Sequence, residues 1–246
     1  MISPSLRSNL APKGKLRVGI NYGNPVLATR DPSSGDLRGV AVDLVHELSR
    51  CVDIPVELVG FEAAGKMVEA LQGDAWDVAF LAADPGRAGE ISFTAPYLEI
   101  EGTYLVQAGS PLRTIADVDR EGVHIALAAN SAYDLFLSRS LKRAQLVRTA
   151  NPTAAFELLF AGKVDVLAGV KQTLVANAGK LPGSRVFDGR FMAIHQALGI
   201  PKGRDVAAKY LREFIEEVKA SGLVAQAIEK AGVRGVSVAP RAPVQQ

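Results

Sequence analysis

An almost wholly apolar run, Trp76 to Ala82, constrains the fold more than any other stretch of the chain. The run reads WDVAFLA, has no helical period, and is followed by an Asp-Pro-Gly turn at 84–86. This pattern is typical of a short strand that is buried on both faces in a parallel sheet. Arg87 follows the turn, where open α/β sheets bind ligands outside the carboxyl ends of their strands. From this position alone, Arg87 is either a solvated loop arginine or a residue that holds a carboxylate by a two-pronged ion pair, and both interpretations remain open at this point.

Strand and helix patterns alternate along most of the chain. Strands are expected at 16–20, 56–59, 76–82, 124–128, 146–148 and 164–168, and helices at 39–52, 64–71, 131–141, 152–161, 206–221 and 223–231. The alternation predicts an α/β fold with doubly wound, mostly parallel sheets flanked by helices. Right-handed crossovers then place the loops that follow the strands at one edge of each sheet.

Composition excludes several classes of function. The 246 residues are 48% apolar and 22% charged, with a net charge of +2 and no block of basic residues that would indicate nucleic acid. No apolar run approaches the ~18 residues of a membrane span. His46, His124 and His195 lie far apart in sequence, so we expect neither a metal site nor a cofactor. Cys51 is the only cysteine and is expected to be a small core residue of the helix at 39–52.

A second motif lies six residues beyond Arg87, where Phe93-Thr94-Ala95-Pro96-Tyr97 matches F-[ST]-x-P-Y. An arginine at this spacing resembles the bacterial solute-binding proteins of family 3, which serve polar amino-acid ABC importers. The resemblance covers about residues 15–235. It implies a two-lobed, periplasmic-binding-protein-like fold in which each lobe is a doubly wound sheet. Lobe 1 would comprise 15–103 plus 194–236 and lobe 2 would comprise 104–193, with flexible termini at 1–14 and 237–246.

The resemblance also implies where a ligand binds. Arg87 would grip the ligand's α-carboxylate from lobe 1, and the Asn130-Ser131 turn would close on the same carboxylate from lobe 2. Relatives usually carry Gly where Asn130 stands. From its position alone, Ser131 is first of all the N-cap of the helix that follows. Capping alone and capping together with anion binding both remain open.

Three departures from the family pattern concern the ligand's α-ammonium group. Val170 stands where the family carries the aspartate that pairs with the ammonium, and Ala82 lies in a turn that is usually rich in Ser and Thr. Asn24 stands where an aromatic residue usually covers the ligand, with Tyr22 as a further ligand-binding candidate in the same loop. A buried ammonium without a partner is heavily penalised. We therefore expect a small carboxylate-bearing ligand that is not an ordinary α-amino acid, unless Glu99 or Glu101 supplies a substitute anion.

The resulting expectation is a non-enzymatic receptor that closes two lobes around a small solute. Its partner would be an ABC permease or a sensor, and the receptor itself would be a monomer without membrane insertion. The resemblance implies a periplasmic location. Residues 1–15 contain no apolar segment of a signal peptide, so a cytoplasmic location remains open.

Two alternative functions remain. An enzyme similar to cyclohexadienyl dehydratase would use the same scaffold, but it needs a carboxylic acid where this chain has Thr173. A fold that has lost its ligand is the other alternative. The segment from Gly60 to Met67 also matches G-x4-G-K of a phosphate-binding loop, but Met67 replaces the hydroxyl residue that would hold Mg²⁺. We expect this segment simply to open a helix.

Overall fold

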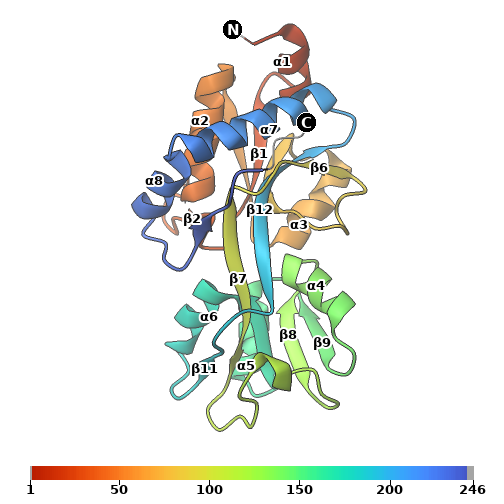
Figure 1. The fold of residues 1–246 in the computed structure, drawn as a ribbon, viewed down its shortest axis with the longest axis vertical. Coiled ribbons are helices and arrows are strands. Elements are labelled where there is room, and N and C mark those ends of the chain that lie inside the picture. The colour runs from red at the N-terminus through yellow and green to blue at the C-terminus, as the bar shows by residue number, and fades with distance from the viewer. Residues whose placement is uncertain (1, 243–246) are drawn as a thin grey trace. The chain divides into compact units, whose positions relative to one another are not determined.

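The computed structural model describes residues 2–242 and divides the chain into two compact units (Figure 1). Unit 1 comprises Met1–Glu62, Lys66–Glu99 and His195–Gln246, and unit 2 comprises Ala63–Gly65 and Ile100–Ile194. Two long strands, β7 (Leu98–Val106) and β12 (Met192–Pro201), carry the chain from one unit into the other. Among the described residues, no helix has the length and apolar character needed to cross a membrane.

Unit 1 contains a sheet of parallel strands with an antiparallel strand added beside them. Its strands are β1 (Leu16–Asn21), β2 (Thr29–Arg30), β3 (Leu37–Arg38), β4 (Val56–Phe61), β5 (Val78–Ala82), β6 (Ile91–Phe93) and β13 (Ser237–Val238), besides parts of β7 and β12. Its helices are α1 (Pro4–Leu10), α2 (Val40–Val52), most of α3 (Ala64–Glu69), α7 (Asp205–Ala220) and α8 (Leu223–Lys230), with a 3-10 turn at Ala70–Gly73. β1 lies between β4 and β5 and is parallel to both, whereas β12 is antiparallel to β5 and β6. Helices α2 and α8 lie side by side (Figure 1).

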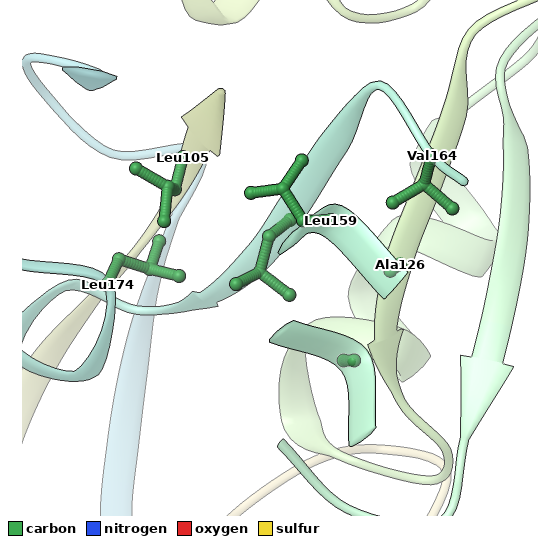
Figure 2. Packing of buried hydrophobic residues seen from close by; sticks show 7 residues of the cluster. Leu105, Ala126, Leu159, Val164 and Leu174 are labelled. Atoms are coloured by element: carbon green, nitrogen blue, oxygen red, sulfur yellow. The ribbon is translucent and has the colours of Figure 1, made fainter. Parts of the chain in front are cut away.

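Unit 2 repeats the alternation on a smaller sheet. Its strands are β8 (His124–Ala128), β9 (Gln145–Thr149), β10 (Val166–Val170), β11 (Arg185–Val186) and part of β7, and its helices are α4 (Ala132–Ser140), α5 (Pro152–Phe160) and α6 (Lys171–Ala178), with a 3-10 turn at Ile115–Asp117. β8 is parallel to β9 and β10, and β7 closes the sheet antiparallel to β10. Figure 2 shows part of the core, where Leu159 of α5 packs with Leu105, Leu174, Val164 and Ala126.

The expected helices and strands are present, with shifts of a few residues at their ends. The largest shift concerns the strand expected at 164–168, which is β10 at Val166–Val170. Asp165 explains the later start, because its carboxylate accepts a hydrogen bond from the backbone N–H of His124 at 2.8 Å and fixes the segment before the strand. α6 follows β10 without a loop, and the sequence pattern did not predict this helix.

The ends of the chain are ordered where we expected flexible termini at 1–14 and 237–246. Ser3 caps α1, and Leu10 of α1 is fully buried, with α7 as the neighbouring helix. At the other end β13 pairs with the start of β7, and the buried Lys219 donates a 2.9 Å hydrogen bond from Nζ to the carbonyl oxygen of Pro240. The expectation was therefore wrong for these segments. Residues 1 and 243–246 lie outside the described part of the chain.

Cys51 also differs from expectation, because it is exposed on α2. The buried stripe of this helix consists of Val40, Ala41, Val42, Leu44, Val45, Leu48 and Val52. Cys51 lies off that stripe, and its thiol contacts Oε1 of Glu47 at 3.5 Å. One residue of offset on a helix, about 100°, is enough to turn a side chain from the core to solvent.

A buried carboxylate joins three parts of unit 1. Asp77, which precedes β5, is fully buried and accepts hydrogen bonds from Nε of Arg17 at 2.9 Å and from Nη1 of Arg204 at 2.9 Å. Arg17 belongs to β1, and Arg204 is the N-cap residue of α7. Burial opposes ionisation, but the hydrogen bonds from Arg17 and Arg204 hold the pKa of the Asp77 carboxyl below its usual range.

We expect Asp77→Asn to lower the free energy of unfolding at pH 7 by about 3 kcal/mol, because it leaves two guanidinium groups without their shared anion. A carboxyl with a depressed folded pKa stabilises the protein above its unfolded pKa of about 4. That contribution is lost as the pH falls through the folded value. Urea unfolding should therefore separate wild type from Asp77→Asn at pH 7, and the gap should narrow below about pH 4.

Asp74→Asn is the matched control, because the Asp74 carboxylate also binds Arg17 but is about half exposed. This variant should unfold near the wild-type urea concentration. Equal stability of wild type and Asp77→Asn at pH 7 would contradict the structural role of Asp77.

Candidate functional site

Arg87 is buried at the carboxyl end of β5. Its residue surface is 5% exposed, and Nη1 donates a 2.7 Å hydrogen bond to the carbonyl oxygen of Ala82, the last residue of β5. Burial lowers the pKa of Arg87 to about 10, against the opposing effect of the Asp84 carboxylate. The guanidinium therefore stays charged at neutral pH. The alternative of a solvated loop arginine is wrong, and the burial means that Arg87 also contributes to the folded structure.

The turn between β5 and Arg87 fixes the position of that side chain. Asp84 is 7% exposed, and its Oδ1 accepts a 2.8 Å hydrogen bond from the backbone N–H of Gly86. The backbone N–H of Arg87 donates to the carbonyl oxygen of Asp84 at 3.0 Å. Asp84 thus closes the turn and brings a negative charge close to the buried guanidinium. Sequence analysis identified the turn but gave Asp84 no role.

The loop after β1 holds the candidates Tyr22 and Asn24. Asn24 is buried, and its side-chain oxygen accepts a 3.1 Å hydrogen bond from the backbone N–H of Val26. This contact folds the loop, so Asn24 has a structural role whatever else it binds. The ring of Tyr22 lies 5.4 Å from the guanidinium carbon of Arg30, in a cation–π contact.

In unit 2 the Asn130-Ser131 turn begins α4. Ser131 is the N-cap residue, and its Oγ accepts a 3.1 Å hydrogen bond from the backbone N–H of Asp134. Asn130 has φ of 56°, in the left-handed region that favours Gly and tolerates Asn. Both observations agree with the capping prediction, and the backbone shape explains why Asn can stand where relatives of the predicted family carry Gly.

The first turn of α4 contains a carboxylate that sequence analysis did not use. Asp134 is 2% exposed and accepts hydrogen bonds from the backbone N–H of Asn130 at 2.8 Å and from Nε of Arg148 at 3.0 Å. A negative charge in the first turn stabilises α4, because it interacts favourably with the positive end of the helix dipole. The Ser131-x-x-Asp134 spacing could have indicated it, whereas nothing in the sequence links Asp134 to Arg148 of β9.

Val170 ends β10 and is the N-cap residue of α6, where it is 7% exposed. The two carboxylates that could replace an aspartate at this position both contact a basic side chain. Oε2 of Glu101 forms an ion pair with Nζ of Lys171 at 2.6 Å, and Oε1 of Glu99 lies 3.4 Å from Nδ1 of His195. The structure therefore gives Glu99 and Glu101 partners within the protein.

The remaining candidates offer no further chemistry. Thr173 lies in the first turn of α6, and Lys66 of α3 forms an ion pair with Glu62, so its charge is matched within the protein. Among residues 2–242 there is no group of three or more His, Cys, Asp or Glu side chains that could hold a metal ion.

Gln196 is the buried polar residue near Arg87 that sequence analysis did not select. It lies on β12 beside Ala82 in the sheet register and is 4% exposed. A glutamine in an apolar strand pattern carries a weak signal, because strand positions near a chain crossover are often polar.

Comparison with known sequences supports one family. The profile of the bacterial extracellular solute-binding proteins, family 3, matches residues 16–233. The ABC transporter glutamine-binding protein of Bacillus subtilis is 20% identical over 218 residues, which are 85% of this chain and 77% of the relative.

Solved structures support the fold. The solute receptor for L-cysteine of Neisseria gonorrhoeae has a TM-score of 0.79 and 22% identity, covering 93% of each chain. An ancestral amino-acid-binding protein, a precursor of cyclohexadienyl dehydratase, has a TM-score of 0.77 and 20% identity, covering 93% of this chain and 99% of the other. The predicted two-lobed, periplasmic-binding-protein-like fold is thereby confirmed.

The left-handed backbone at Asn130 yields a test of the turn. Asn130→Gly and Asn130→Ala both remove the side-chain amide, so the difference between them isolates the backbone term. We expect Asn130→Ala to be less stable than Asn130→Gly by about 1 kcal/mol, because a Cβ atom is disfavoured at this φ. Urea unfolding of the two variants measures the difference. An Ala variant at least as stable as the Gly variant would contradict the geometry.

Proposed function

Because the chain belongs to the bacterial extracellular solute-binding proteins of family 3, we propose that it is the substrate-binding receptor of an ABC importer. Its two lobes would close around a small solute that carries a carboxylate. Closure follows from differential affinity, since a ligand that gains contacts in the closed form stabilises that form. The proposed partner is a membrane permease. The proposed working compartment is outside the cytoplasm, and the family's description as extracellular supports that proposal.

The burial of Arg87 at the end of β5 is the observation that carries this proposal. Charged guanidinium groups are rarely buried, because removing one from water costs roughly several kcal/mol unless a partner group offsets that cost. The Ala82 carbonyl and the Asp84 charge both interact with the Arg87 guanidinium within the protein. A ligand carboxylate at the carboxyl end of β5 would add two parallel hydrogen bonds, which is the geometry that arginine favours.

The relatives' names state amino acids as their ligands. The residues that could contact an α-ammonium group in this chain favour a different class of ligand. Val170 and Ala82 are apolar, and Glu99 and Glu101 already contact His195 and Lys171. Asp84 closes its turn and balances Arg87. An ammonium group would therefore have to compete for a carboxylate that is already engaged. We propose that the ligand has a carboxylate but lacks the α-amine of an ordinary amino acid.

A receptor fits better than an enzyme. The position at which the dehydratase resemblance requires a carboxylic acid is occupied by Thr173, whose hydroxyl is far too weak an acid for that role. The Bacillus subtilis relative described above is named as a binding protein, and the Neisseria gonorrhoeae structure is named as a solute receptor. Incubation with prephenate or arogenate, followed by product absorbance, should show no turnover.

Ligand class is tested by thermal shift. Small carboxylates without an α-amine should raise the melting temperature more than the amino acids of the same skeleton. A ligand at 100 times its Kd adds about 2.7 kcal/mol to the free energy of unfolding, which a melting curve detects readily. Tight binding of glutamine, cysteine or arginine, with no response to the amine-free acids, would refute the proposed ligand class.

Arg87 is tested by titration with the strongest amine-free acid of that screen. Arg87→Ala should weaken binding by about 2–5 kcal/mol, because it leaves the ligand carboxylate buried without its partner. Arg87→Lys should recover only part of the loss, since an ammonium cannot form the planar two-pronged contact. Arg38→Ala is the control, because its exposed guanidinium lies on β3 and forms an ion pair with Asp31 at 3.6 Å.

Both Arg87 variants should also melt at a lower temperature, because the hydrogen bond to the Ala82 carbonyl is lost or weakened. Circular dichroism at the titration temperature shows whether each variant is folded before binding is measured. A folded Arg87→Ala variant that binds within about threefold of wild type would mean that the carboxylate is held elsewhere.

A further inference from the structure

Gln196 is a buried polar residue of unit 1 that lies beside the carboxyl end of β5. Gln196 is 4% exposed, and its Oε1 accepts no hydrogen bond from any residue that the structure describes. Leaving a buried acceptor without a donor costs about 1–3 kcal/mol. A donor from outside the chain would remove that cost.

The sheet register brings Gln196 close to Arg87. Gln196 of β12 is the antiparallel partner of Ala82 in β5, and the backbone N–H of Ala83 donates to the carbonyl oxygen of His195 at 2.9 Å. Directly opposed residues of two antiparallel strands have Cα atoms about 5 Å apart. Arg87 is hydrogen-bonded to the carbonyl oxygen of the same Ala82. Arg87 and Gln196 thus both lie next to Ala82 within unit 1.

A third polar group shares this neighbourhood. Phe80 and Leu198 form the next opposed pair on the face that carries Ala82 and Gln196, because side chains alternate along a strand. The ring of Tyr97 packs edge-on against Phe80 at 5.6 Å. Tyr97 is fully buried, and among the described residues its hydroxyl has no hydrogen-bond partner. Burial raises the pKa of Tyr97, so the hydroxyl stays neutral.

We propose that Gln196 accepts a hydrogen bond from a hydroxyl group of the ligand, close to the carboxylate that Arg87 holds. The ligand class is then a hydroxy acid. This inference rests on the proposed function, since it assigns the second polar group of the same ligand. Arg87 supplies a positive charge for the carboxylate, and Gln196 supplies a neutral acceptor for a neutral donor.

The charges around Gln196 favour a hydroxyl over an ammonium. A neutral amide oxygen accepts from either group, but only a hydroxyl can be buried against it without a compensating anion. The neighbouring carboxylates are Glu99, which contacts His195, and Asp84, which lies beside Arg87. A hydroxy acid places one negative charge beside Arg87 and needs no further ion.

The experiment compares acids that differ in a single group. Propionate, 2-hydroxypropionate, 3-hydroxypropionate and alanine form one series; a larger series is 4-methylpentanoate, its 2-hydroxy derivative and leucine. Calorimetric titration of the full chain gives a Kd for each compound. We expect a hydroxy acid to bind about fivefold to tenfold more tightly than the acid without the hydroxyl, and the amino acid to bind most weakly.

Two variants test whether Gln196 causes the preference for a hydroxy acid. Gln196→Leu should bring the Kd values of the hydroxy acid and the parent acid within twofold of each other. Gln107→Leu is the matched control, because the Gln107 amide donates to the Leu159 carbonyl inside unit 2. That variant should keep the wild-type preference.

The outcomes separate this inference from the proposed function. Binding of the parent acids and hydroxy acids with equal affinity overturns the role of Gln196 and leaves the carboxylate receptor standing. A hydroxyl preference that survives Gln196→Leu also overturns it. Absence of binding by every acid, with tight binding of an amino acid, overturns the inference and the proposed ligand class together.

Discussion

Unit 1 depends on one buried carboxylate. Asp77 precedes β5 and binds a guanidinium from β1 and another from the start of α7, so the strand is anchored to its neighbour and to the helix that follows β12. With that end fixed, the five buried residues of β5 determine where the strand stops and where Arg87 emerges. The position of the candidate site is therefore set by an ion pair at the opposite end of the strand. Loss of the anion would loosen both ends of β5.

The two units bury charge in different ways. Unit 1 buries the Arg87 guanidinium beside Asp84 and the Ala82 carbonyl, whereas unit 2 surrounds the Asp134 carboxylate with donors from Asn130 and Arg148. At the end of β10 the apolar Val170 lies opposite Gly102, and the adjacent Glu101 forms an ion pair with Lys171. The carboxylate near Val170 is therefore already paired within unit 2.

Local patterns in the sequence predicted the parts of the fold that depend on near neighbours. The apolar run at 76–82 became β5, and Ser131 became a helix cap, since both rest on periodicity or on contacts within a few residues. The predicted burial of Cys51 and the predicted start of β10 were wrong by one or two residues along the helix and the strand. Contacts between distant segments carried no such signal: Asp77 with Arg204, Gln196 beside Ala82, and Lys219 on the chain's end appear only once the sheet is assembled. The candidate site lies largely among such contacts, so the sequence located Arg87 but not the groups around it.

The order of strands also determines when each unit can form during synthesis. Unit 2 is almost continuous in sequence, so its sheet and core are available once residues 100–194 have left the ribosome. Unit 1 must wait, because Leu198 of β12 bonds Thr94 across 104 residues and Lys219 bonds the Pro96 carbonyl across 123. Until then β5 is paired with β1 on one side only, and its other edge has no strand beside it. Open strand edges of this kind are prone to mispairing. β12 covers that edge and brings Gln196 opposite Ala82, so the surroundings of Arg87 are complete only after β12 has been synthesised.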